Sequence, residues 1–491
     1  MGIAYRIVMR AAGAASALIG IAMASALAVS LFFREYREAA GFAFCLVVTL
    51  LFAGALYLLS RPRAAGEPEP KPRDAMLIVT VWWVTSSVFG GLPYMACGVL
   101  GGPADAVFES VSGFTTTGAT ILGGLPALPR GVLLWRSVTG WLGGLEILAA
   151  SLAMLPPFGA GHAIAQIESA ANLSERPLAR ERGAALRLCA VYAGGTALLF
   201  LLLCGAATKP FDAVLLTLGA VSSSGFSSHA GGMVEISGAA AFFLCVFMLH
   251  AAVNFTLRHR FFARRNNLLL RDEELRWFFL IFCCAAVVIA LYLLFAAPRG
   301  AAAQNVGNAF FEAASALSTT GYHRETVFFW PPFCRMLLLF LMLTGGCAAS
   351  AAGGMKVGRL IILFRLLRRN ISIRLHPNAV LPIKFGGRAV PTDTVNAIAA
   401  HAMLCVAVFF IATTILCFDG AVPSAVSVFG VLACMSNAGP AVSAANPAFA
   451  TAVWAAYSPP AKLFLSFLMI LGRLEFTTVL LLFTPRYWKN D

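Results

Sequence analysis

Charged side chains are scarce in this chain of 491 residues. Only 12% of the residues are Asp, Glu, Lys or Arg, about half of the roughly 25% found in soluble domains. This scarcity excludes a water-soluble enzyme, a disordered scaffold and a coiled coil. Hydrophobic residues make up 59% of the chain, and several stretches reach the roughly 20 apolar residues that a helix needs to cross a bilayer. The composition is that of a polytopic membrane protein.

Signatures of bound metal, disulfides and nucleotides are also missing from the sequence. The twelve cysteines lie singly or adjacent in apolar surroundings, without a CxxC pair near histidines, so neither a zinc site nor a disulfide framework is predicted. There is no Walker lysine motif and no GxGxxG on a βαβ unit, so nucleotide control must come from another polypeptide. The few intramembrane charges do not form the convergent set that a membrane-embedded enzyme needs. We therefore predict that the chain is not an enzyme.

Ten apolar stretches, separated by helix breakers, are candidate membrane helices. They run over residues 11–33, 41–60, 75–98, 131–155, 185–207, 236–256, 276–297, 332–364, 394–418 and 460–484. The stretch that begins at Pro332 contains Gly345, Gly346, Gly353 and Gly354, so a break in its middle is expected. An even number of crossings places both termini on the same side of the membrane.

Basic residues are distributed unevenly between the two faces that this layout creates. The chain has 36 Lys and Arg against 22 Asp and Glu, a formal net charge of +14, and most of the basic residues fall in loops on the side of the termini. Because positive loops concentrate on the cytoplasmic side, both termini are predicted to lie in the cytoplasm, with the chain in the cytoplasmic (inner) membrane. The positive charge is interpreted as basic cytoplasmic loops and not as a nucleic-acid-binding surface.

A short segment recurs four times, each time followed by a turn rich in Ser, Thr or Asn that ends in glycine. The copies read DAVFESVSGFTTTGAT (105–120), DAVLLTLGAVSSSGFS (212–227), NAFFEAASALSTTGYH (308–323) and VSVFGVLACMSNAGPA (426–441). They align on Gly118, Gly225, Gly321 and Gly439. Thirteen positions before the glycine, the first three copies carry the predicted helix N-caps Asp105, Asp212 and Asn308. In the fourth copy Ser424 is predicted to take this role. Six positions before the glycine the residue is small in every copy: Ser112, Gly219, Ser315 and Ala433.

The spacing of these copies predicts a pore. A half-helix of about ten residues cannot cross a bilayer, and irregular backbone at membrane depth is tolerated only inside protein or around a water-filled cavity. Four such loops around one axis would direct the negative ends of their helix dipoles and a ring of backbone carbonyls at a dehydrated monovalent cation. A single TTTG or SSSG would favour an ordinary external turn. Four copies that share offset, cap, small residue and glycine make that alternative improbable.

With these motifs, the sequence resembles the Trk/Ktr/HKT superfamily of potassium transporters, in particular its TrkH-type membrane subunit. Nearly the whole chain takes part, in ordered motifs that include TTTGAT (115–120), WLGG (141–144), GGCAASAAGGMKVGR (345–359), SNAGP (436–440) and GRLE (472–475). The resemblance implies an all-α polytopic membrane protein with four pseudo-symmetric helix–pore loop–helix repeats around a central ion pore. An N-terminal two-helix hairpin brings the total to about ten transmembrane helices. The implied divisions are 1–74 for the hairpin and linker, and 75–160, 161–258, 259–375 and 376–491 for the repeats.

The resemblance also implies which residues form the selectivity filter that holds K⁺. They are Thr116, Thr117, Gly118, Ser223, Ser224, Gly225, Thr319, Thr320, Gly321, Asn437, Ala438 and Gly439. Glycine at all four filter positions resembles the members that prefer K⁺, so potassium uptake is the expected function. The second loop departs from the usual pattern with three consecutive serines (222–224). A Na⁺-permeable or ion-coupled symporter on the same fold is the alternative.

A movable barrier is expected in the glycine-rich break, because small residues and permissive backbone suit such a segment. The implied gating residues are Gly345, Gly346, Gly353, Gly354, Lys356 and Arg473. Close packing between helices would also account for small residues, though less well for paired glycines. Arg473 would raise the barrier for a cation near the path or pair with an acid such as Glu475. Glu146 departs from the family pattern, and its role stays open between a structural pair and a protonated acid.

The resemblance finally implies partners. These are a second copy of the chain, giving a homodimer, and a cytosolic nucleotide-binding, TrkA-like regulatory subunit that gates the pore. The predicted docking surface for this subunit is the basic cytoplasmic loops, chiefly 258–276 and 356–388. No cofactor is predicted besides the transported K⁺.

Overall fold

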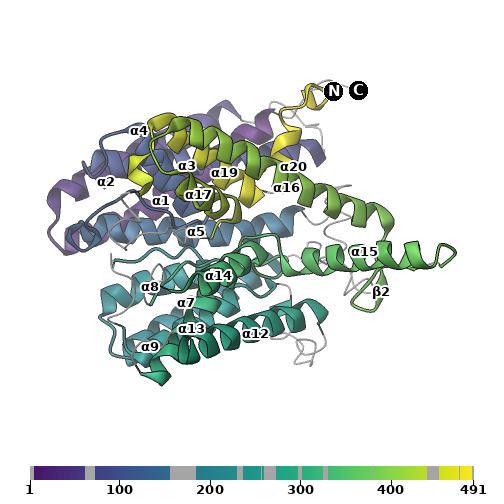
Figure 1. The fold of residues 1–491 in the computed structure, drawn as a ribbon. Coiled ribbons are helices and arrows are strands. Elements are labelled where there is room, and N and C mark those ends of the chain that lie inside the picture. Colours follow the sequence, from purple (N-terminus) through teal and green to yellow (C-terminus); the bar gives the residue numbers. More distant parts are fainter. Residues whose placement is uncertain are drawn as a thin grey trace.

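The computed structural model of the chain describes residues 5–60, 72–154, 184–228, 236–255, 257–258, 272–296, 301–324, 330–379, 381–438, 453–474 and 476–488. Across these residues the protein is a bundle of helices (Figure 1). The strands of the described part are β1 (Lys384–Phe385) and β2 (Arg388–Ala389), which form a small antiparallel hairpin with Lys384 opposite Ala389 and Phe385 opposite Arg388. The predicted all-α class is confirmed.

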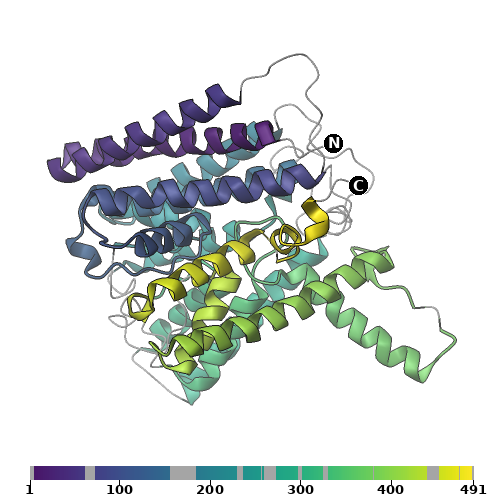
Figure 2. The same ribbon diagram turned by 90° about the horizontal axis from the view of Figure 1, so that it is seen from above.

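The first two helices form an antiparallel pair along one edge of the bundle (Figure 2). Helix α1 spans Tyr5–Phe32 and α2 spans Tyr36–Leu59, which confirms the expected N-terminal hairpin. Small residues bring the two helices together: a Cβ at Gly13 would lie 3.3 Å from Ala53 O, and one at Gly20 would lie 2.9 Å from Leu50 Cδ2. Such close approach of backbones stabilises helix pairs in membranes, where apolar surface alone provides little driving force.

The rest of the chain repeats a pattern of long helix, half-helix and a further helix whose length differs between repeats. The four sets are α3 (Pro72–Ala96), α4 (Pro103–Phe114) and α5 (Arg130–Met154); α7 (Ala184–Gly205), α8 (Pro210–Ser222) and α9 (Gly238–Ala251); α12 (Glu273–Phe295), α13 (Ala302–Leu317) and α14 (Pro332–Thr344); and α16 (Thr392–Asp419), α17 (Ser424–Ser436) and α19 (Pro459–Leu474). A 3₁₀ turn, η1 (Leu125–Ala127), precedes α5, and the short helices α20 (Phe476–Leu481) and α21 (Pro485–Trp488) follow α19. The predicted break after Pro332 is confirmed, because α14 ends at Thr344 and α15 begins at Val357 and ends at Leu375.

Six of the described helices are long and apolar enough to cross a membrane: Tyr5–Phe32, Tyr36–Leu59, Met76–Ala96, Arg187–Gly205, Glu273–Phe295 and Thr392–Asp419. The other predicted crossings correspond to helices that are shorter or carry buried polar residues. Helix α9 has 14 residues and α14 has 13, so each is about 20 Å long at 1.5 Å per residue. Helix α5 carries the buried Arg136 and Glu146. Arg136 of α5 pairs with Glu109 of the half-helix α4.

The predicted N-caps are wrong in all four copies. Proline occupies the first position of α4 and α8 and precedes α17, whereas α13 begins at Ala302, well before Asn308. The fixed φ of proline suits a helix start, so these helices begin earlier than the acidic residues. Asp105 and Asp212 lie instead in the first helical turn, where a carboxylate interacts favourably with the dipole. Asp105 accepts from Lys462 Nζ at 2.7 Å, and Asp212 from Ser228 Oγ at 2.8 Å.

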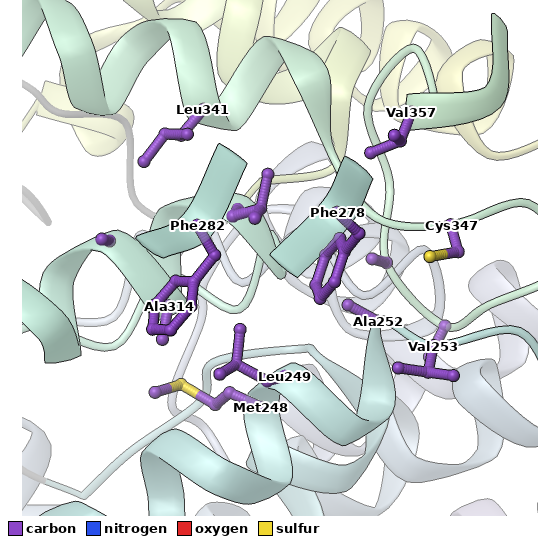
Figure 3. Close-up of a cluster of buried hydrophobic side chains, with 14 of the residues drawn as sticks. Met248, Leu249, Ala252, Val253, Phe278, Phe282, Ala314, Leu341, Cys347 and Val357 are labelled. Atoms are coloured by element: carbon purple, nitrogen blue, oxygen red, sulfur yellow. The ribbon is translucent and has the colours of Figure 1, made fainter. Parts of the chain in front are cut away.

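The apolar core has two main clusters, one around α7–α15 and one around α1–α5 with α16–α20. In the first cluster, Phe278 and Phe282 of α12 lie between Met248 and Leu249 of α9 and Leu341 of α14 (Figure 3). The same cluster includes Cys347, near the start of the break between α14 and α15, and Val357, the first residue after it. The segment in the break is therefore anchored on the core at both ends.

Candidate ion-conduction site

All four half-helices end in the same backbone turn. The residue two places before the aligned glycine is left-handed in each repeat, with φ 54° at Thr116, 58° at Ser223, 55° at Thr319 and 47° at Asn437. This conformation is uncommon for residues other than glycine. The glycines that follow also have positive φ: 76° at Gly118, 69° at Gly225 and 80° at Gly321. Gly439 lies outside the described residues.

The hydrogen bonds of these turns are those of a Schellman motif, in which the left-handed residue and its successor donate back to the last helical turn. The backbone N–H of the left-handed residue donates to the carbonyl three positions earlier: Thr116 to Gly113 O at 2.9 Å, Ser223 to Ala220 O at 3.3 Å, Thr319 to Ala316 O at 3.1 Å and Asn437 to Cys434 O at 3.4 Å. The backbone N–H of the next residue donates to the carbonyl five positions earlier: Thr117 to Ser112 O at 2.9 Å, Ser224 to Gly219 O at 3.0 Å, Thr320 to Ser315 O at 3.0 Å and Ala438 to Ala433 O at 3.1 Å. The small residue six places before each glycine therefore supplies the carbonyl on which the loop folds back.

Acidic side chains brace two of the loops from behind. Glu109 Oε2 accepts a hydrogen bond from Ile121 N at 3.0 Å, and Glu312 Oε1 accepts one from Arg324 N at 2.7 Å. In both repeats the acceptor stands nine positions before the glycine and the donor three positions after it. Glu109 also forms a buried ion pair with Arg136 Nε at 2.9 Å. The shared acid seen in the first and third copies of the repeat thus holds the outgoing half of the loop.

Contacts between successive loops draw them into one ring. The first and second are joined by Arg136 Nη1, which donates to Ser227 O at 3.4 Å. Tyr322 Oη of the third loop donates to Leu216 O and Phe226 O of the second repeat, at 3.1 and 3.0 Å. Asn437 Nδ2 of the fourth donates to Thr117 Oγ1 of the first at 3.1 Å. The described filter residues, predicted from four distant parts of the sequence, are brought together.

The glycine-rich segment, residues 345–356, lies against the turns of the second, third and fourth loops. Ser223 Oγ donates to Ala351 O at 2.9 Å, and Gly353 N donates to Thr319 Oγ1 at 2.7 Å. Gly354 N donates to Ser436 O at 2.9 Å. The segment therefore completes the contact between the third and fourth repeats.

Glycine is required in this segment by close approach. A Cβ at Gly353 would lie 1.9 Å from Ser436 O, and one at Gly345 would lie 2.2 Å from Gly353 O. A Cβ at Gly346 would lie 2.6 Å from that of Ala352. Gly345 and Gly354 have φ of 71° and 76°. The segment has no room for side chains at these positions, which explains the paired glycines.

The two cationic residues predicted for gating both bond to carbonyls of the glycine-rich segment. Arg473 Nη1, buried on α19, donates to Ala351 O at 2.8 Å. Lys356 Nζ donates to Ala352 O. Glu475, the alternative partner for Arg473, lies outside the described residues. Glu146 accepts a hydrogen bond from Ser86 Oγ at 3.3 Å, and its carboxyl group interacts electrostatically with the guanidinium of Arg473.

Sequence reasoning missed the left-handed turn before each glycine. Only Asn437 gave a signal for it, because asparagine tolerates this conformation, whereas the β-branched Thr116 and Thr319 disfavour it. It also missed Glu274, which contacts the glycine-rich segment from α12. Nothing in the local sequence separates Glu274 from the adjacent Asp272 and Glu273 at the start of that helix.

Four pseudo-symmetric repeats whose half-helices converge on a ring of loops within a bundle of membrane helices define a pore-type membrane transport protein. The model of the TrkH family, described as cation transport protein, matches residues 40–490. The chain belongs to this family.

Individual relatives resemble the chain over its whole length. The Trk system potassium uptake protein TrkH of Halomonas elongata is 32% identical over 489 residues, covering 99% of both chains. The protein of the same name from Escherichia coli K12 is 31% identical over 468 residues, 93% of this chain and 94% of the relative. The crystal structure of the potassium transporter TrkH from Vibrio parahaemolyticus superposes with a TM-score of 0.89 at 30% identity, covering 99% of this chain and 100% of that one.

Proposed function

We propose that this protein mediates potassium uptake through a membrane pore whose selectivity filter is the ring of four loops. The observation that carries the proposal is the shared turn at the ends of α4, α8, α13 and α17. Each half-helix presents its carbonyl end, which carries about half a negative charge, to the loop. Carbonyls in such a ring replace the water around a dehydrated cation. The inside-negative potential supplies about 2.3 kcal/mol per charge per 100 mV, so uptake needs no chemistry by this chain.

Potassium is the favoured ion for two reasons. The relatives that match over the whole chain are named as potassium uptake proteins. Glycine occupies all four filter positions: Gly118, Gly225, Gly321 and Gly439. A Na⁺-permeable or ion-coupled symporter is the second candidate, motivated by the three serines at 222–224, whose hydroxyls can add ligands.

The glycine-rich segment is proposed to be the gate. Support comes from its contacts with Ser223, Thr319 and Ser436, which hold it against three of the four turns. Gly353 allows it to lie this close to the fourth turn, and Gly345, Gly346 and Gly354 allow the segment to fold tightly on itself and on its neighbours. Lys356 and Arg473 add positive charge beside the proposed path. A cation crossing here meets both steric and electrostatic resistance, so movement of the segment would open the pore.

The partners are proposed from the part of the molecule that leaves the bundle. Helix α15 projects from it with the β1–β2 hairpin at its side (Figures 1 and 2). Phe364, Leu367, Ile371 and Leu375 are 55–72% exposed along one face of this helix, which a second copy of the chain would cover in a homodimer. A cytosolic nucleotide-binding regulatory subunit is proposed to dock on the basic residues of 258–276 and 356–388, of which 259–271 lie outside the described residues. We propose that the protein lies in the inner membrane and that both of its termini are on the cytoplasmic side.

The test is growth of K⁺-uptake-deficient cells at low external K⁺, together with ion flux into liposomes that hold the purified protein. Uptake of K⁺ without any co-ion gradient, and its reduction relative to Na⁺ in Gly118→Ser, would support the proposal. Dependence of K⁺ uptake on a Na⁺ or H⁺ gradient would favour the symporter. Failure to rescue growth, with high Na⁺ flux, would overturn the ion assignment. Gly194→Ala, at a helix surface where a Cβ meets nothing within 4 Å, is the matched control.

A further inference from the structure

One buried carboxylate holds the glycine-rich segment at both of its ends. Glu274, in the first turn of α12, accepts a hydrogen bond from Ala348 N at 2.9 Å and another from Gly358 N at 3.0 Å, both on Oε1. Ala348 lies near the start of the segment, and Gly358 lies just beyond its end. The Glu274 residue is 8% exposed. Hydrogen bonds to a charged group in such surroundings are stronger than neutral ones, so this contact fixes the separation of the two ends.

The contact with Gly358 also completes the start of α15. The N-cap position of that helix is Lys356, whose side chain makes no capping hydrogen bond. Because the first N–H groups of a helix lack partners within it, a carboxylate from a neighbouring helix can serve as the cap and interact with the dipole. A Cβ at Gly358 would lie 3.0 Å from Glu274 Oε1, so glycine at this position is what allows the carboxylate to come close.

The preceding residue, Glu273, bonds to α15 and to the β1–β2 hairpin. Its carboxylate forms an ion pair with Arg365 of α15 and accepts a hydrogen bond from Gly386 N of the hairpin turn at 2.7 Å. Arg365 also donates to Lys384 O in β1. Two adjacent carboxylates at one helix end thus hold the segment on one side and α15 with the β1–β2 hairpin on the other. Phe278, one turn further along α12, packs in the same cluster as Cys347 and Val357 (Figure 3).

We propose that Glu274 is the latch that keeps the glycine-rich segment under the four loops, and that Glu273 couples this latch to the position of α15 and the β1–β2 hairpin. The inference rests on the proposed function of the segment as a gate. Displacement of the hairpin pulls on Glu273 through Arg365 and Gly386, turns the amino end of α12, and withdraws Glu274 from Ala348 and Gly358. Glu273 and Glu274 would therefore act as positioning residues, since both belong to α12 and not to the proposed filter or the glycine-rich segment.

The first experiment compares Glu274→Ala and Glu274→Gln with the wild-type protein in liposomes. Labelling of Cys347 by N-ethylmaleimide, measured by mass spectrometry, reports the position of the segment, because this thiol is 1% exposed when the segment is in place. Glu274→Ala loses two charge-assisted hydrogen bonds and is expected to raise both labelling and ⁸⁶Rb⁺ flux by at least about tenfold, the change that a single such bond produces in a two-state equilibrium. Glu274→Gln keeps an acceptor oxygen without the charge and is expected to give an intermediate value.

The matched control is Glu35→Ala. Glu35 is also a carboxylate that accepts from two backbone N–H groups at a helix start, Arg130 at 2.8 Å and Gly131 at 3.1 Å, but it does not contact the segment. Wild-type labelling in a folded Glu274→Ala would overturn the latch. Increased labelling with unchanged flux would keep the latch and overturn the gate. If Glu274→Ala fails to fold, Gly358→Ala decides the question, because its Cβ displaces the same carboxylate.

The coupling is tested by a double-mutant cycle. Arg365→Ala releases Glu273 and leaves Glu274 in place, so Cys347 labelling is expected to rise by a few fold, less than in Glu274→Ala. If both act on one latch, the double variant labels no faster than Glu274→Ala alone, since coupled sites are non-additive. Additive effects in the double variant, or wild-type labelling in Arg365→Ala, would overturn the coupling.

Discussion

The side-chain amide of Asn437 donates a hydrogen bond to the hydroxyl of Thr117 at 3.1 Å, although the two residues are 320 positions apart in the sequence. The same amide donates to Met469 O at 2.9 Å. These bonds join the fourth loop to the first and to the helix that follows the fourth. Asn437 also has φ 47°, which asparagine tolerates better than most residues.

Replacing Asn437 separates its backbone role from its side-chain role. Asn437→Gly keeps the left-handed turn and loses two hydrogen bonds, worth about 1 kcal/mol each, and we expect the preference for K⁺ over Na⁺ to fall by about tenfold. Asn437→Ala adds about 1–2 kcal/mol of backbone strain, so its preference for K⁺ should fall further than that of Asn437→Gly. Competition between Na⁺ and ⁸⁶Rb⁺ uptake measures the preference. An alanine variant that outperforms the glycine variant would contradict this assignment.

Gly225 is expected to tolerate no side chain. A Cβ there would lie 1.9 Å from Thr320 O of the next loop, and φ is 69°. Overpacking of this kind costs about 1–3 kcal/mol and displaces the Thr320 carbonyl of the proposed filter, so Gly225→Ala should reduce K⁺ uptake by at least about tenfold. Gly194→Ala on α7, with open space around it, should leave uptake unchanged. Equal K⁺ uptake by the two variants would contradict the close packing of Gly225 against the third loop.

The buried ion pair of Glu109 and Arg136 predicts a strong effect on stability. The two side chains are 0% and 2% exposed, so Arg136→Met leaves a buried carboxylate without its ion-pair partner and should lower the free energy of unfolding by about 3–5 kcal/mol. The double variant Glu109→Gln/Arg136→Met should regain at least half of this loss. Thermal denaturation in detergent measures both.

A more exposed ion pair provides the comparison. Lys462 and Asp105 lie 2.7 Å apart with side-chain exposures of 8% and 30%, and Lys462→Met should cost about 1 kcal/mol, as expected where solvent screens the charges. A loss at Lys462 as large as that at Arg136 would contradict the assignment of the larger effect to burial.

Removal of the positive charge of Arg473 should increase ion flux. Arg473→Ala loses a charged donor to Ala351 O, and the loss of about 1.5 kcal/mol corresponds to roughly tenfold in the open fraction. Ser223→Ala removes another donor to the same carbonyl without changing charge, so it shows how much of the effect is tethering alone. Flux into liposomes checks both variants. Flux that falls in Arg473→Ala would show that the arginine assists conduction.

The six long apolar helices could be predicted from the sequence, because length and apolarity decide them. The break between α14 and α15 was also predictable, since Gly345, Gly346, Gly353 and Gly354 interrupt an apolar stretch. The N-caps were not, because proline at the first helical position outweighs the acidic residue two places later. The β1–β2 hairpin, with two residues in each strand, is too short to leave a periodic pattern.

The candidate site was predictable where the four copies agree and unpredictable where a single side chain acts at long range. Alignment of the glycines located the loops, and the small residue six places earlier marked the carbonyl of the turn. The bonds of Ser223, Thr319 and Glu274 to the glycine-rich segment join residues 34 to 128 positions apart. No local pattern reports such contacts, because they depend on how the repeats pack.

Thr319 takes part in two structures at once, since it forms the turn of the third loop and its hydroxyl accepts from Gly353 N of the segment below. If the third loop holds a cation, as proposed, that cation and the segment are linked through one side chain. Linkage is reciprocal: whatever factor the segment imposes on cation affinity, the cation imposes on the segment. Under the proposed function, the permeating ion therefore acts on the segment as an effector, and the external ion concentration influences how often the pore opens.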